Sequence, residues 1–98
     1  MSKEDLHFEH EKYRANRASL ENSLLRLENG YNRVWDRYQQ GMDQAEREGW
    51  LGSFNFEGYR RELGEWQTQI ENCQAQIRDA GEGLRLIELE LRRLGTGT

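Results

Sequence analysis

The chain has 98 residues, of which 33% are charged and 35% hydrophobic, and its formal net charge is −4 at pH 7. This length allows one domain, covering residues 1–98. Neither half carries the basic block that nucleic-acid-binding proteins use to displace counterions from phosphate, so we expect no nucleic-acid partner. No apolar run is long enough for a membrane span or a signal-peptide core, so we expect no membrane insertion. The protein is then cytoplasmic, or it is secreted by a route that does not read a signal peptide.

The composition favours long helices. The chain contains no proline, and proline is the residue that breaks a helix by removing an amide donor and clashing with the preceding turn. Three Trp, four Tyr and three Phe distinguish it from disordered chains, which are poor in aromatic residues. We therefore expect an all-α protein.

The first half of the chain has a seven-residue apolar repeat, which is typical of a helix packed along one seam. One set of seam positions holds Leu6, Tyr13, Leu20, Leu27 and Val34, and the alternate set holds Leu24, Tyr31, Tyr38 and Ala45. Further toward the N-terminus the alternate positions become Arg17 and His10, which weakens the seam. The repeat predicts a helix over about 3–48, with Ser2 capping its first amides.

The second half continues the pattern without a break. Its steps alternate between four and three residues through Tyr59, Leu63, Trp66, Ile70, Cys73, Ile77, Ala80, Leu84, Ile87, Leu91 and Leu94. This repeat predicts a second helix over about 54–94.

The segment "GWLGS" at 49–53 lies between the two helical patterns. Gly49 suits a left-handed helix cap, and either Ser53 or Asn55 can cap the next helix. So short a link forces the helices into an antiparallel hairpin. Folding about residue 51 would place Trp66 near Tyr38.

Several large apolar residues fall outside the seam, and a two-helix core is too thin to cover them. They are Phe8, Leu25, Trp35, Met42, Leu86 and Leu89. Since burying such a side chain contributes about 1.5–3 kcal/mol, we expect a partner, most simply a second copy forming a four-helix bundle. The alternative is that scattered exposed apolar residues are normal. Three glycines in the second helix, Gly64, Gly81 and Gly83, indicate either close approach of another chain or tolerated surface positions.

The residues that carry chemistry form no convincing site. His7 and His10 lie three apart with Glu11 adjacent, but a metal needs about four converging ligands or three plus water. Cys73 lies in the seam, where a buried thiol is inert. We therefore expect no enzyme activity, no cofactor and no metal.

The central tripeptide Trp50-Leu51-Gly52 is a W-x-G motif at the turn of a two-helix chain. It resembles the WXG100 (ESAT-6-like) family of small helical hairpins, and Tyr59, Trp66 and "IRDAGEGL" at 77–84 strengthen the resemblance. The resemblance implies a homodimer or heterodimer that is exported by type VII secretion. In physical terms, a glycine permits the sharp reversal, while the indole covers the open end of the helix pair and donates its N–H to a free carbonyl.

The C-terminus departs from the family. Members that carry their own export signal have a tyrosine followed four residues later by Asp or Glu, whereas this chain ends "LRRLGTGT". Either a partner carries the signal or the protein is not exported. The alternative reading is a cytosolic inhibitor, immunity protein or chaperone, for example phage-encoded, that binds and blocks another protein. For either function the expected partner-binding residues are Trp50, Gly52, Phe54, Phe56, Trp35, Met42, Leu86 and Leu89.

Overall fold

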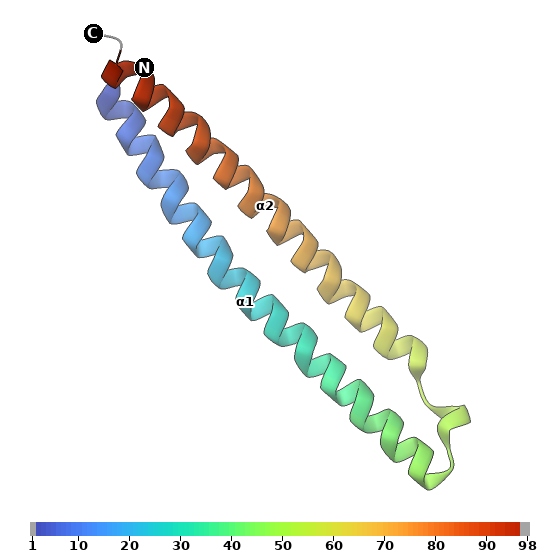
Figure 1. Ribbon diagram of the computed structural model, residues 1–98. Coiled ribbons are helices and arrows are strands. Elements are labelled where there is room, and N and C mark those ends of the chain that lie inside the picture. The colour runs from blue at the N-terminus through green and yellow to red at the C-terminus, as the bar shows by residue number, and fades with distance from the viewer. Residues whose placement is uncertain (1, 97–98) are drawn as a thin grey trace. The chain divides into compact units, whose positions relative to one another are not determined.

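The computed structural model describes residues 2–96 and is a two-helix hairpin (Figure 1). Helix α1 covers Lys3–Glu48, a short 3₁₀ turn η1 covers Leu51–Ser53, and helix α2 covers Phe56–Thr96. The described residues contain no strand. The all-α hairpin predicted from the two heptad patterns is confirmed. Met1, Gly97 and Thr98, which the predicted domain includes, lie outside the described residues.

Both ends of α1 are capped as predicted. The Asp5 amide donates to Ser2 Oγ at 3.2 Å. At the other end Gly49 has a φ of 80°, its amide donates to the Glu46 carbonyl, and the Trp50 amide donates to the Ala45 carbonyl at 2.9 Å. These two bonds form a Schellman motif, which satisfies carbonyls that the helix leaves without partners.

Helix α2 begins two residues later than predicted because Phe54 is extended, with φ −69° and ψ 137°. Asn55 then acts as the N-cap, and its Oδ1 accepts a hydrogen bond from the Gly58 amide at 3.0 Å. Of the two caps considered, Asn55 is therefore the one used.

The helix pair divides into two compact units, each built from a segment of α1 and a segment of α2. The terminal unit contains the residues up to Ser23 and those from Cys73 onward, and the turn unit contains Leu24–Asn72. The two are described separately below. The single domain predicted from the chain length stays a prediction.

In the terminal unit the core consists of predicted seam residues, but two other predicted seam residues, Tyr13 and Leu94, are each 36% exposed. Leu6, Cys73, Ala80 and Leu84 are buried, and Cys73 Sγ lies 3.3 Å from the Leu20 carbonyl oxygen, to which the thiol donates. The Tyr13 ring packs over Gly83, where an added methyl group would lie 2.8 Å from a ring carbon. Gly83 therefore makes room for a residue of the same chain, whereas Gly81 has nothing within 4 Å.

The turn unit buries Val34, Ala45 and Leu63. Here the predicted register is wrong: the Trp66 ring lies against Gly30, two helical turns from Tyr38. The hairpin does not fold symmetrically about residue 51, because the segment after η1 runs back along α1. Phe54 thereby packs against Gly41, where an added methyl group would lie 2.9 Å from the ring.

Candidate protein-binding site

Six aromatic rings gather in the turn unit, and we call this set the aromatic cluster. Tyr38 is its centre, with ring centroids 5.6 Å from Trp35 and 5.4 Å from Tyr59. Phe54 is a second centre, 4.9 Å from Phe56 and 5.5 Å from Tyr59. These are separations at which offset-stacked and edge-to-face aromatic pairs attract. The full set is Trp35, Tyr38, Trp50, Phe54, Phe56 and Tyr59.

Local structure explains how each ring reaches the cluster. Trp35 and Tyr38 are three residues apart on α1, and such residues are neighbours on a helix surface. Phe54 comes from the extended linker and fits because Gly41 has no side chain. Tyr59 lies on the first turn of α2, where its ring stacks at 12° to that of Phe54.

Trp50 lies at the edge of the aromatic cluster and is 41% exposed. Its ring centroid is 6.2 Å from that of Phe54. Its indole Nε1–H donates to Glu48 Oε2 at 2.7 Å, so the acceptor is a carboxylate and not the backbone carbonyl that we predicted. This hydrogen bond, with a second from Gln44, lowers the pKa of the exposed Glu48 carboxyl.

Gly52 does not have the role predicted for the glycine of the W-x-G motif. Gly49, and not Gly52, has the positive φ at the reversal. An added methyl group at Gly52 would meet nothing within 4 Å. The geometry of this chain therefore gives no reason for a glycine at position 52.

The other predicted partner-binding residues divide between the two units. Trp35, in the aromatic cluster, is 41% exposed, and Met42, seven residues further along α1, is half-buried. Leu86 and Leu89 lie on α2 in the terminal unit and are both exposed. Phe8 and Leu25 are exposed as well. Five of the six off-seam residues are thus exposed, and Met42 is the exception.

Sequence reasoning missed two groups of residues that build the site. Tyr38 and Tyr59 were assigned to the seam and were not among the predicted partner-binding residues, yet their rings pack together at the centre of the aromatic cluster. Gly30 and Gly41 were not singled out, although each accommodates an aromatic ring. A signal was present for Gly41, because it lies seven residues after Val34 and so occupies a seam position without a side chain.

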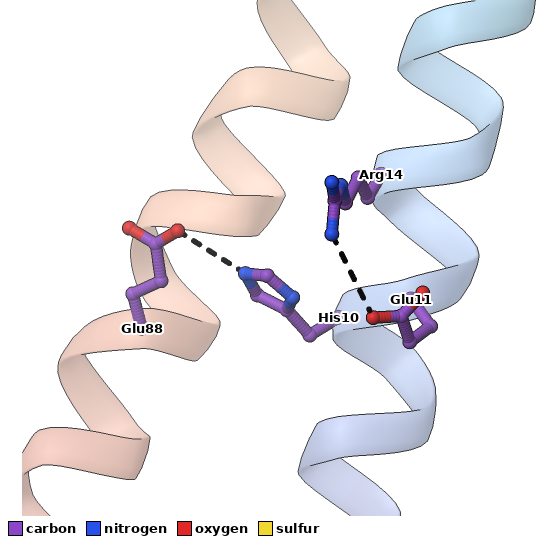
Figure 2. A network of polar contacts seen from close by, with 4 residues as sticks. All are labelled: His10, Glu11, Arg14 and Glu88. Atoms are coloured by element: carbon purple, nitrogen blue, oxygen red, sulfur yellow. Dashed lines mark hydrogen bonds and ion pairs between the residues drawn. The ribbon is translucent and has the colours of Figure 1, made fainter.

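The terminal unit contains a small polar network (Figure 2). His10 Nε2 lies 3.1 Å from Glu88 Oε1, which joins α1 to α2, while Glu11 and Arg14 pair along α1 at 3.9 Å. His7 takes no part in these contacts. Over residues 2–96 no group of three or more His, Cys, Asp or Glu side chains is placed to hold a metal ion.

Comparison with protein-family models, with curated proteins and with solved structures finds no match to this chain. Within the described range, neither helix has a stretch long and apolar enough to cross a bilayer.

Proposed function

We propose that this protein is a non-enzymatic protein-binding hairpin that acts as a dimer or with a paired helical partner. The observation that carries the proposal is the exposure of Trp35 and Trp50 at the edge of a cluster whose other four rings are half-buried. Tryptophan is enriched at binding hot spots, because a large rigid ring contributes much area for little lost conformational freedom.

The remaining exposed apolar residues support the same function. Leu86 is 54% exposed and Leu89 is 45% exposed, and they are three residues apart on α2. A contiguous patch of exposed apolar side chains on a protein surface marks an interaction site. A partner helix laid over them would recover part of the burial free energy that the hairpin alone forgoes, about 1.5–3 kcal/mol for a fully buried side chain.

The resemblance to WXG100 proteins favours a partner of similar shape. Under this proposal the W-x-G turn presents Trp50, and a paired hairpin carries the export signal. The competing proposal is a cytosolic inhibitor, immunity or chaperone protein that binds and blocks another protein.

Sedimentation equilibrium from low to high micromolar concentration tests the proposal. We expect a reversible monomer–dimer equilibrium, or a one-to-one complex with a hairpin protein encoded by a neighbouring gene. A protein that stays monomeric and binds no hairpin contradicts the proposed pairing. In that case, binding to the product of a neighbouring toxin or phage gene would favour the inhibitor.

A further inference from the structure

Three shallow, open hollows lie on the surface of the turn unit, lined by residues of α1, of α2 and of the linker between them. Their volumes are about 470, 490 and 790 Å³. Arg37 and Glu62 line both the first and the second, and Arg33, Asp36 and Trp66 line both the second and the third. Because neighbouring hollows share walls, they form one surface, which we call the arginine groove.

Trp66 provides apolar surface in the second and third hollows, while Trp50, Phe54 and Tyr59 of the aromatic cluster line the first. One side of the Trp66 ring lies against Gly30, and the residue is only half-buried. From α1, Val34 lines the second hollow and Leu27 lines the third. A large apolar side chain of a ligand can therefore pack on the indole without displacing any part of the hairpin.

Helix α1 contributes three arginines and one carboxylate, Asp36, to the rim. Arg26, Arg33 and Arg37 line the groove, and the guanidinium of Arg37 forms an exposed ion pair with Glu62 at 3.1 Å. Within residues 2–96 neither Arg26 nor Arg33 has a carboxylate within ion-pair distance. They lie seven residues apart on α1, or about 10 Å, on either side of the half-exposed indole.

We propose that the arginine groove binds an acidic segment of a protein partner. Two carboxylates of that segment would pair with Arg26 and Arg33, and an apolar side chain between them would pack on Trp66. Guanidinium groups suit this role because they bind carboxylates through two parallel hydrogen bonds. The inference rests on the proposed protein-binding function, and it names the chemistry of the partner.

A protein ligand fits this groove better than a nucleic acid. Arginine beside tryptophan also suits single-stranded nucleic acid, which stacks its bases on aromatic rings. Asp36, however, lines two of the three hollows, and the whole chain carries a net charge of −4. A backbone with a phosphate at every nucleotide would meet the Asp36 carboxylate, whereas a short peptide can place its two carboxylates at Arg26 and Arg33 and a neutral residue beside Asp36.

Selection from a displayed library of short random peptides tests the proposal. The immobilised wild-type protein should enrich sequences in which an aromatic or aliphatic residue lies between Asp or Glu residues. The Arg26→Glu/Arg33→Glu double variant should not enrich them. Failure to enrich any family of sequences, or enrichment of sequences without acidic residues, would overturn the proposal.

Fluorescence titration with a selected peptide then measures the effect of each charge. We expect each single reversal, Arg26→Glu or Arg33→Glu, to weaken binding about tenfold or more, as loss of a charge-assisted pair does. Arg78→Glu, an exposed α2 residue of the terminal unit, is the matched control and should leave binding unchanged. Equal weakening by Arg26→Glu, Arg33→Glu and Arg78→Glu would show a general charge effect and contradict binding in the arginine groove. Tighter binding of an oligouridylate than of the peptide would also contradict the proposal. If the hairpin pairs as proposed while these variants bind the peptide normally, the groove fails and the proposed function stands.

Discussion

The Trp66 ring lies over Gly30, so closely that a methyl group on that glycine would be 2.5 Å from two ring carbons. This contact joins α2 to α1 in the turn unit. A second contact of the same kind, Phe54 on Gly41, lies nearer the turn. Because a side chain at Gly30 or Gly41 would clash with the ring that lies there, these two contacts favour the register found in the turn unit.

Gly30→Ala should destabilise the protein. Overpacking costs about 1–3 kcal/mol, and the clash with a rigid indole places this site toward the upper end. Replacing glycine by alanine in a helix returns about 1 kcal/mol, so we expect a net loss of about 1–2 kcal/mol in the free energy of unfolding. Urea denaturation measures it.

Gly64→Ala is the matched control, because Gly64 also lies in a helix but has nothing within 4 Å of an added methyl group. It should stabilise the protein by about 1 kcal/mol. Equal stabilisation by both substitutions would show that Trp66 does not pack on Gly30.

Gly49→Ala should destabilise the turn, whereas Gly52→Ala should not. Gly49 has a φ of 80°, a conformation that costs other residues roughly 1–2 kcal/mol. Gly52 lacks a positive φ and has open space around it. Thermal unfolding of the two variants compares them directly. A larger loss at Gly52 than at Gly49 would restore the role first predicted for the motif glycine.

Asn55→Ala should lower the free energy of unfolding by about 1 kcal/mol, which is typical of removing an N-cap. The Asn55 side chain satisfies the Gly58 amide, which has no partner within α2. Asn55→Asp keeps an acceptor and should retain most of the stability. Chemical denaturation of both variants gives the comparison, and an unchanged Asn55→Ala would mean that the cap is not formed in solution.

The carboxyl of Glu48 should titrate below its usual range, because the indole N–H of Trp50 donates to it. A carboxyl whose pKa is lowered by folding contributes stability above its unfolded pKa, and that stability is lost as the pH falls through the folded pKa. Trp50→Phe removes the indole donor, so the pKa of Glu48 should rise, although Gln44 still donates. NMR titration of the Glu48 carboxyl carbon measures the pKa in both proteins. Identical titration curves would rule out the Trp50–Glu48 bond in solution.

The two helices were predictable, because heptad repeats and the lack of proline are local signals that need no knowledge of the partner helix. The helix predicted over 3–48 is observed as Lys3–Glu48, and the caps at Ser2 and Gly49 follow from local chemistry alone. The buried seam residues were predictable for the same reason, whereas Tyr13 and Leu94, predicted for the seam, are each 36% exposed.

The register was not predictable from the spacing of the seam. A heptad pattern states which face of a helix is buried, but it does not state which turn of the other helix lies opposite. That choice depends on how the linker runs back along α1, and therefore on the fit of Phe54 against Gly41. The aromatic cluster could be predicted from the sequence only in part, for a related reason. The exposure of Trp35 follows from its place beside the seam. The role of Tyr38, however, depends on rings from α1, the linker and α2.

Sedimentation equilibrium of Trp35→Gln beside Leu25→Gln tests the central claim most directly, since both residues are exposed, large and apolar and only Trp35 belongs to the aromatic cluster. Both variants should fold, because neither residue is buried. The account predicts that Trp35→Gln weakens pairing, with a second copy or with a hairpin partner, by about tenfold or more, as loss of a hot-spot tryptophan does, while Leu25→Gln leaves it nearly unchanged. Pairing that survives Trp35→Gln at full strength would contradict the claim that the aromatic cluster is where the partner binds.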